Sequence, residues 1–271
     1  RDQFRGHPRV SMIFAPHAPY TVADDSFREI RLLANELDTQ IHMHVHETAS
    51  EISASQKRHA RRPLQRLDEL GLLTPLLAAV HMTQLTAGEI PLLASRGVSV
   101  VHCPESNLKL ASGFCPIADL AAAGINIALG TDGASSNNDL DMFGEMRSCA
   151  LLAKGVAQRA DAAPAATVLG MATLNGAKAL GLGDRIGSLV TGKEADVICV
   201  DLSAAATQPV YDPVSQLVYA TSRDQVSDVW VAGRQLLADH EPLLADAPAI
   251  LARAEAWRAR LSAAHGSVAD D

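Results

Sequence analysis

Short apolar runs alternate with segments of helical periodicity from residue 10 to about residue 155. Strands that are apolar throughout and separated by helices are typical of a parallel sheet covered on both faces, either doubly wound or closed into a barrel. The runs that predict strands are "VSMIFA" at 10–15, "QIHMHV", "LLAAVHM", "VSVVHCP" and "INIALGTD". The sequence therefore predicts an α/β protein whose ligand site lies at the carboxyl ends of the strands.

Two of the predicted helices have recognisable ends. In "TAGEIPLLASRG", Thr86 is a candidate cap and Gly97 a candidate stop. A later helix is expected from about Leu140 to Lys154, with Gly155 closing it.

The pattern changes to β after the helical segment "PAATVLGMATLNGAKALGL". The stretches "GSLVTGKEADVICVDLS" and "VSDVWVAGRQLLAD" alternate β-branched residues with glycine and aspartate turn signals, which favours a small antiparallel sheet. The end of the chain has the pattern of an Ala-rich amphipathic helix with a frayed tail. We therefore expect a β/α portion over residues 1–185, a β portion over 186–240, and a helix and tail over 241–271.

Composition and charge exclude several classes of function. With 23 Lys and Arg against 31 Asp and Glu the net charge is −8, and the basic residues are scattered, so nucleic acid is excluded as a partner. The apolar runs are shorter than the ~18 residues that a membrane span needs. The four cysteines lack CxxC spacing, which fits reduced thiols in the cytoplasm. Because the chain starts at Arg1 without methionine, we expect it to be the later part of a longer chain.

The stretch "IHMHVHETAS" holds the first candidate site. His42, His44 and His46 would share one strand face, and Glu47 joins a histidine only if the chain leaves the strand around Val45. An imidazole from His44 and the carboxylate of Glu47 would then suit zinc or iron and proton transfer beside the metal-bound water. Two other interpretations stay open: three solvated histidines, or His42 and His44 as the HxH pair that opens many metallohydrolase sites.

Further candidates follow the other strands. His81 ends "LLAAVHM", and Asp132 follows "INIAL" between glycines that allow a tight turn. Taken singly, His81 also fits a structural group and Asp132 an ordinary helix cap. His17 lies on a proline-constrained loop, "APHAPYT", where it is placed to touch a substrate. His102 and Cys103 suggest a ligand pair, but we expect them to be structural.

These candidates share one position in the pattern. His17, His44 with Glu47, His81 and Asp132 come from four different β/α units, each at the same end of its strand. Such a coincidence is improbable by chance. The sequence therefore predicts that they converge on one site.

Six motifs resemble, in order, the later two thirds of the amidohydrolase superfamily. They are "APHAPYT", "HVHET", "VHMT", "VHCPESNLKLASG", "GTDGASSNNDLDMF" and "MATLNGAKALGL" with "GSLVTGKEADVICVDL". Within it the chain is similar to the 5-methylthioadenosine/S-adenosylhomocysteine deaminases and their triazine-hydrolase relatives, from about residue 10 to residue 240. The resemblance implies a (β/α)₈ TIM barrel, with the region of strands four to eight present here, and a small β-sandwich to which the C-terminal part contributes.

The resemblance also implies one divalent metal per chain at the barrel mouth, Zn²⁺ with Fe²⁺ as the alternative. His44 of the fifth strand and Asp132 of the eighth would bind it, with further HxH ligands expected upstream of residue 1. Glu47 would move protons and contact the purine, and Asp132 would also contact substrate and act as a base. His81 of the sixth strand would orient the water or stabilise developing charge, and His17 would help hold the nucleoside.

The function implied is zinc-dependent hydrolytic deamination of an adenine nucleoside, 5′-methylthioadenosine or S-adenosylhomocysteine, to an inosine-type product with release of ammonia. A carboxylate at Glu47 favours deamination over dechlorination. The nearest alternative is a guanine or triazine aminohydrolase, and a non-catalytic barrel remnant is the alternative from another class. The resemblance further implies a homo-oligomer whose partner is a small nucleoside. The charge, the apolar runs and the cysteines favour a cytoplasmic protein without nucleic-acid or membrane partners.

Overall fold

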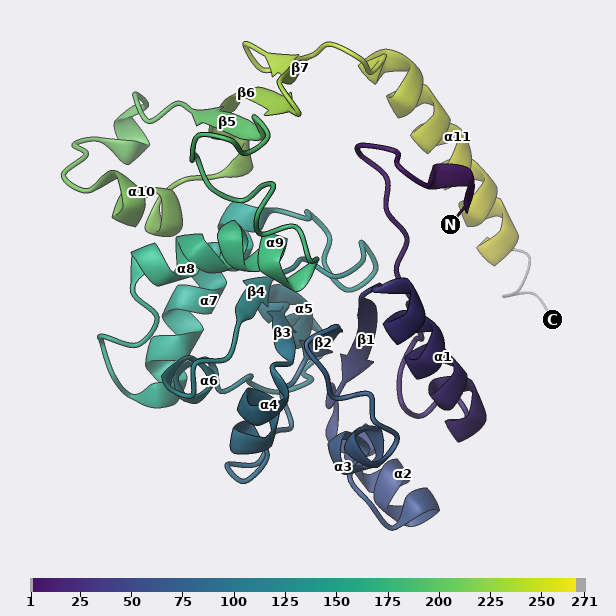
Figure 1. Ribbon diagram of the computed structural model, residues 1–271. Helices are drawn as coiled ribbons and strands as arrows, with labels where there is room; N and C mark the ends of the chain where they lie inside the picture. The colour runs from purple at the N-terminus through teal and green to yellow at the C-terminus, as the bar shows by residue number, and fades with distance from the viewer. Residues whose placement is uncertain (1, 267–271) are drawn as a thin grey trace. The chain divides into compact units, whose positions relative to one another are not determined.

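The computed structural model describes residues 2–266, which fall into two compact units (Figure 1). The β/α unit contains the chain up to Lys193 together with Leu202–Arg223. The antiparallel unit contains Glu194–Asp201 and the chain from Asp224 onward.

A four-stranded parallel sheet forms the centre of the β/α unit, with its strands in sequence order (Figure 1). The strands are β1 (Ile41–Val45), β2 (Leu77–His81), β3 (Ser99–His102) and β4 (Ile127–Leu129). Each was predicted as an apolar run, and the parallel α/β arrangement is confirmed. A parallel pair needs a long crossover, which the helices between these strands provide.

The first predicted strand, residues 10–15, is wrong as an extended element. Only Phe14 forms a bridge, parallel to Ile41 of β1. Phe14 donates its N–H to the Gln40 carbonyl at 3.0 Å and accepts one from His42 at 2.9 Å. After Phe14 the next donor of a regular ladder would be residue 16, a proline without an N–H, and the pairing resumes at the His17 carbonyl, which accepts the His44 N–H at 3.2 Å. Residues 10–13 have no partner in β1, because β1 begins at Ile41, shortly after the left-handed end of α1 at Asp38.

Ten helices of the β/α unit accompany the sheet within residues 2–266. They are α1 (Asp24–Leu37), α2 (Ala49–His59), α3 (Pro63–Glu69), α4 (Ile90–Arg96), α5 (Pro104–Lys109), α6 (Ile117–Ala122), α7 (Met142–Ala157), α8 (Ala165–Ala172), α9 (Leu174–Ala179) and α10 (Pro213–Tyr219). The helices α8 and α9 contact β4. The segment predicted as one helix after residue 163 forms two helices, α8 and α9, which meet at Thr173.

The predicted helix ends were right at one position and wrong at two. Gly97 ends α4 with a left-handed φ of 67°, as expected. Thr86 does not cap α4, whose N-cap is Glu89; the Glu89 carboxylate instead accepts the Thr86 N–H at 2.8 Å. Gly155 does not stop α7, which continues to Ala157 and ends at the left-handed Gln158. A glycine inside a helix only weakens it, so packing can carry the helix through.

The antiparallel unit contains the small sheet that the sequence predicted. Its strands pair in order and are β5 (Val197–Val200), β6 (Val226–Val231), β7 (Arg234–Ala238) and β8 (Glu241–Pro242). The final helix, α11, spans Ala247–Gly266, and its described side chains are exposed rather than divided into two faces. The predicted amphipathic pattern of this helix therefore does not correspond to a buried face, and the tail after residue 266 lies outside the described residues.

The sheet of the β/α unit is buried, and all five residues of β2 are inaccessible to solvent. One face carries small apolar side chains that cluster with Ala179 of α9: Ala78, Val80, Val101, Cys103 and Ala128. None of the helices in the described part of the chain combines the length and the hydrophobicity that a membrane crossing requires.

Candidate metal centre and active site

His44 lies on β1, on the sheet face that borders a cavity. Its Nδ1 lies 2.7 Å from the carbonyl oxygen of His17, and its main-chain N–H donates to the same oxygen at 3.2 Å. A carbonyl in this place accepts the Nδ1 proton, so the lone pair of the neutral ring lies on Nε2. His44 therefore presents Nε2 as a ligand atom.

His81 is the last residue of β2, and its backbone turns it towards His44. The register pairs Val80 with His44 and His81 with Val45, so simple alternation would place the His81 side chain on the opposite face. A left-handed φ of 77° breaks this alternation, and the two imidazoles stack with centroids 5.3 Å apart. Its Nδ1 lies 2.8 Å from Asn107 Oδ1, so Nε2 faces the site. Burial lowers the pKa of His81, which favours the neutral ring.

Asp132 follows β4 and also has a left-handed backbone, with φ of 60°. Ser106 of α5 and Ser136 of the following turn each donate a hydroxyl to Oδ2 at 2.7 Å. Burial raises the pKa of Asp132, but the hydrogen bonds from Ser136, Ser106 and the Gly133 backbone outweigh it and leave the pKa below its ordinary value. The carboxylate is thus ionised at neutral pH. Within residues 2–266 its Oδ1 accepts no side-chain donor.

The three side chains meet although they come from strands far apart in the sequence. One ligand atom each from His44, His81 and Asp132 lies within 4.8 Å of the other two. Two imidazoles and one carboxylate are the donor types that zinc binds in catalytic sites. The carbonyl on His44 Nδ1 and the hydroxyls on Asp132 are the outer contacts that orient such ligands. The arrangement therefore fits a divalent transition metal.

Glu47 reaches this group because the chain turns after β1, as the sequence required. The strand ends at Val45, and His46 has a left-handed φ of 55°. The Glu47 carboxylate then ends 4.0 Å from His81 Nε2 and is largely shielded from solvent. A carboxylate in this position is a candidate for proton transfer at the ligating group.

His46 does not share the face of His42 and His44, and that prediction was wrong. The turn buries His46 completely, and its Nε2 accepts the N–H of Leu64 at 3.1 Å. Burial lowers the pKa of His46 to about 4. His42 does line the cavity beside His44, but the ligating group around His44 is made with His81 and Asp132 instead.

His17 lies beside the metal group on its proline-constrained loop. Its ring packs edge-on against His44, with centroids 5.2 Å apart, and edge-on against Tyr20 at 5.8 Å. Its Nδ1 lies 3.2 Å from Thr21 Oγ1. The loop thus places an imidazole and a phenol next to the candidate centre.

His102 and Cys103 are buried at the end of β3, 3% and 1% exposed. Burial lowers the pKa of His102 to about 3 and raises that of the Cys103 thiol far above its ordinary range. Neither belongs to the ligating group. Their burial is consistent with the structural role expected from the sequence, and all four cysteines of the chain are free thiols.

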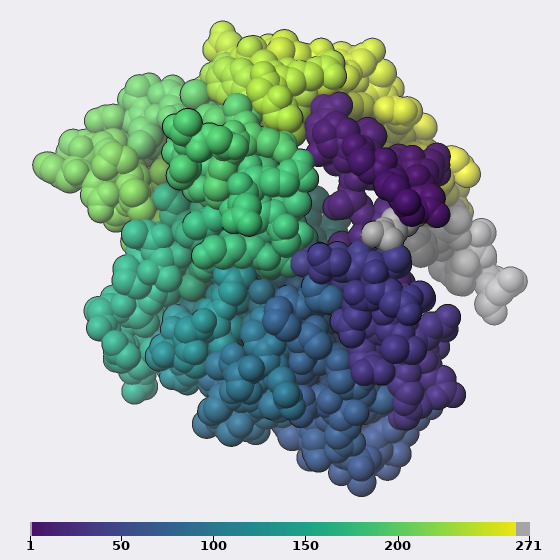
Figure 2. All heavy atoms as spheres, in the orientation of Figure 1, coloured from purple at the N-terminus to yellow at the C-terminus, as the bar shows by residue number. Residues whose placement is uncertain are grey.

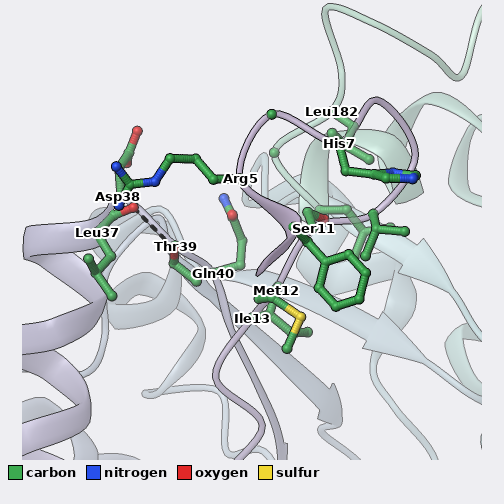
Figure 3. A pocket seen from close by; sticks show the side chains of 15 residues that line it. Arg5, His7, Ser11, Met12, Ile13, Leu37, Asp38, Thr39, Gln40 and Leu182 are labelled. Carbon is green, nitrogen blue, oxygen red and sulfur yellow. Dashed lines mark hydrogen bonds between the residues drawn. The ribbon is translucent and has the colours of Figure 1, made fainter. Parts of the chain in front are cut away.

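Two cavities of the β/α unit differ in chemistry. A cavity of about 230 Å³ is lined by His42, His44 and Asp132 together with the small apolar side chains of the sheet. A larger cavity of about 330 Å³ lies beside the N-terminal segment, drawn in purple in Figure 2, and is lined by residues 4–7, 10–13, 37–40 and 180–182. Figure 3 shows its lining, with the hydrogen bond from Thr39 to the Leu37 carbonyl at 3.1 Å. None of the candidate site residues lines the larger cavity, so we place the chemistry at the smaller one.

Four supporting residues were missed by the sequence analysis: Ser106, Asn107, Ser136 and Glu51. They hold Asp132, His81 and the turn that carries Glu47. The first three lie in the quoted motifs "VHCPESNLKLASG" and "GTDGASSNNDLDMF". Polar residues in the first turns after a strand end were the available signal, but their partners lie up to 26 residues away and only the fold identifies them.

Comparison with known proteins places the whole arrangement in context. The model of the amidohydrolase family matches residues 3–236. A 5-methylthioadenosine/S-adenosylhomocysteine deaminase from Teredinibacter turnerae is 53% identical over 263 residues, which are 97% of this chain and 60% of that protein. A 5′-deoxyadenosine deaminase from Methanothermobacter thermautotrophicus is 42% identical, over 94% of this chain and 59% of that protein.

Solved structures give the same picture. The chain is similar to an adenosine deaminase from Xanthomonas campestris with bound zinc, with a TM-score of 0.95 and 58% identity over 97% of this chain and 60% of the other. It is also similar to a zinc complex of atrazine chlorohydrolase from Arthrobacter aurescens, with a TM-score of 0.86 and 26% identity over 94% and 58% of the two chains. The chain thus spans about 60% of the length of the curated relatives it matches. On this evidence, the chain belongs to the amidohydrolase family.

Proposed function

We propose that this chain forms most of the active site of a zinc-dependent aminohydrolase that deaminates an adenine nucleoside, 5′-methylthioadenosine or S-adenosylhomocysteine. The observation that carries the proposal is the convergence of His44, His81 and Asp132 within 4.8 Å, with Glu47 beside them. The names of relatives with 42–53% identity supply the substrate class.

The architecture of the complete protein is part of the proposal. The parallel sheet of the β/α unit would be one side of a closed (β/α)₈ barrel, with the Phe14 segment as strand four and β1 to β4 as strands five to eight. Residues 1–185 would belong to that barrel. The sheet of β5 to β8 would be part of a small β-sandwich over residues 186–240, followed by the helix and tail of 241–271.

One metal ion per chain, zinc, would be held by His44 and Asp132, with an HxH pair from another part of the protein. When bound, zinc supplies the Lewis acidity that makes water nucleophilic at neutral pH. His44 is oriented for this through its Nδ1 contact to the His17 carbonyl, and Asp132 through its two serine hydroxyls. His81 lies equally close, but its Nε2 also faces Glu47, so we assign it to orienting the water and stabilising charge.

The remaining steps are proton movements. Asp132, ionised at neutral pH, takes the proton of the attacking water. Glu47 takes the second proton of the water and passes it to the ring nitrogen as the C–O bond forms. The proton held by Asp132 reaches the amino group, the C–N bond breaks, and ammonia leaves an inosine-type product. His17, edge-on to His44, would contact the nucleoside.

A substrate panel tests this proposal in the zinc-loaded protein in its longest natural form. Methylthioadenosine, adenosylhomocysteine, adenosine, guanine and triazines are compared by ammonia release. We expect the adenine nucleosides to have the highest kcat/KM. A preference for guanine or a triazine would support the alternative aminohydrolase, and no turnover with no bound zinc would support a non-catalytic remnant.

The variant Glu47→Gln separates proton transfer from metal binding. We expect ammonia release to be abolished while one zinc per chain is retained, because Glu47 is not one of the ligating side chains. Normal turnover in this variant would refute the role of Glu47.

A further inference from the structure

The turn that carries Glu47 is fixed by a second carboxylate, Glu51. Glu51 Oε1 accepts the N–H of His46 at 3.1 Å, and Oε2 accepts the N–H of Glu47 at 2.7 Å. The Glu51 residue is only 5% exposed. The two carboxylate oxygens thus accept the N–H groups of two consecutive residues that follow the end of β1 and have no partner in the sheet.

The start of α2 holds Glu51 in this position. Thr48 is the N-cap of the helix, and its Oγ1 accepts the Glu51 N–H at 3.2 Å. In an ordinary capping box, the glutamate at this spacing reaches back to the N-cap N–H. Here it reaches further, to the two residues before the cap. The capping-box spacing of Thr48 and Glu51 therefore fixes the turn that leads from β1 into α2.

The other side of the turn is fixed by the loop that follows β2. Thr83 Oγ1 donates to the Glu47 carbonyl at 2.6 Å, and the Gln84 N–H donates to the His46 carbonyl at 3.1 Å. Thr83 lies two residues after His81, so the backbone of Glu47 is tied to the loop of its imidazole neighbour. Glu47 is therefore held on its N–H by Glu51 and on its carbonyl by Thr83.

Burying the Glu51 carboxyl costs free energy, because the charged form loses its hydration. A solvent-exposed capping glutamate would not have this cost. Burial raises the pKa of Glu51, and the backbone N–H groups of Glu47 and His46 oppose that rise. The left-handed backbone at His46 adds strain, since a residue with a side chain rarely adopts it. Both features serve one geometric result, which is that the Glu47 carboxylate ends 4.0 Å from His81 Nε2.

We propose that Glu51 is a positioning residue of the active site, which fixes the Glu47 backbone so that the Glu47 carboxylate faces His81 and the substrate. The assignment rests on the proposed function for its catalytic consequence. It goes beyond that function because Glu51 touches neither the ligating side chains nor the substrate position. A displacement of about 1 Å in a reacting group lowers the rate by about 100-fold, so the turn is a point of high sensitivity.

The test is Glu51→Gln in the zinc-loaded protein in its longest natural form. A glutamine has one carbonyl oxygen and one NH₂ group, so it cannot accept both N–H groups in the way the two carboxylate oxygens do. We expect kcat to fall about 10- to 100-fold, with KM within about threefold and zinc content unchanged. Amide hydrogen exchange at His46 and Glu47 should accelerate by at least about tenfold, because their acceptors are weakened.

The control is Ile52→Ala, the buried neighbour of Glu51 on α2, which makes none of the turn's hydrogen bonds. It should lower thermal stability but leave kcat within about twofold and the two amides protected. Equal loss of kcat in both variants would show that Glu51 acts only through stability and would overturn the proposal. Unchanged exchange of the two amides in Glu51→Gln would overturn it as well.

The same measurements separate this inference from the proposed function. If the unmodified protein releases no ammonia from any nucleoside, the proposed function fails, while amide exchange and zinc content still test the position of Glu47. If the unmodified protein is active and Glu51→Gln is equally active, the positioning role fails and the proposed function stands.

Discussion

Two aspartates, one in each unit, accept a serine hydroxyl at the same distance and yet differ in what they can do. Ser106 donates to Asp132 at 2.7 Å, and Ser227 donates to Asp228 of β6 at 2.7 Å. The second oxygen of Asp228 accepts the Gln235 side chain at 3.0 Å, so both of its oxygens are used. Asp132 receives both of its hydroxyls on one oxygen and faces two imidazoles.

The difference comes from the sheets. Parallel strands deliver their carboxyl ends to one edge, so side chains from β1, β2 and the loop after β4 meet there. In an antiparallel sheet, the carboxyl ends of neighbouring strands lie at opposite edges. The residues of β6 are also only half-buried. A hydrogen-bonded carboxylate thus becomes a site only where topology brings other ligands to it.

The largest effect is expected from removing the charge at each aspartate. Asp132→Asn should lower kcat/KM by at least about 1,000-fold and reduce zinc content, because a ligand and a base are lost together. Asp228→Asn should leave both within about twofold. Ammonia release and metal analysis of the two variants measure the contrast, and comparable losses would remove the distinction between the units.

Core substitutions test whether the two units differ in stability as they do in burial. Leu67→Ala in α3, at a fully buried position, should lower the free energy of unfolding by about 2–5 kcal/mol. Ile198→Ala in β5, where the side chain is 50% exposed, should cost less than about 1 kcal/mol. Urea unfolding of both variants measures this, and a larger loss at Ile198 would contradict the assignment of the main core to the β/α unit.

Removing the serine hydroxyls compares the two aspartates directly. Ser106→Ala should weaken zinc affinity about 10- to 100-fold, since the hydroxyl orients the Asp132 carboxylate. Ser227→Ala removes an equivalent hydroxyl 2.7 Å from Asp228 and should leave zinc affinity unchanged. Competition with a chromogenic chelator gives both constants. Equal affinities in the two variants would mean that Ser136 alone holds Asp132.

A buried acid of the β/α unit gives a pH dependence. Burial raises the pKa of Glu145, which is inaccessible to solvent, to about 8. Between pH 4.5 and about pH 8 the folded protein keeps the Glu145 proton, whereas the unfolded chain loses it. The contribution of Glu145 to the free energy of unfolding is therefore complete below pH 4.5 and is lost as the pH rises to about 8.

The expected slope is at most about 1.4 kcal/mol per pH unit. Glu145→Gln should flatten it, whereas Glu69→Gln, at an exposed ion pair with Arg61, should not. Urea midpoints at pH 5 and pH 8 measure the slope. A slope that persists in Glu145→Gln would assign the titration to another group.

The order of strands and helices could be predicted because apolar runs and strand ends are local features of the sequence. The convergence of His44, His81 and Asp132 was predicted in this way, since each lies near the carboxyl end of an apolar run. The predicted strand at 10–15 failed because the pattern of apolar residues does not show where the neighbouring strand begins. β1 starts at Ile41, opposite Phe14, so residues 10–13 have no strand to pair with.

The supporting contacts could not be predicted for a different reason. Asn107 is 26 residues from His81 and shares no periodic pattern with it, so only the packing of α5 against the strand ends reveals their pairing. The burial of His46 likewise depends on one left-handed residue and on Leu64, which lies 18 residues away.

The left-handed backbones at His46, His81 and Asp132 have a consequence for engineering thermal resistance. Glycine would relax each of them by of order 1 kcal/mol, which makes these positions attractive to any search for a hardier variant. Such a search would delete His81 and Asp132, two of the three side chains that meet at the candidate metal centre. At these two positions, thermal stability and reactivity are therefore in direct conflict.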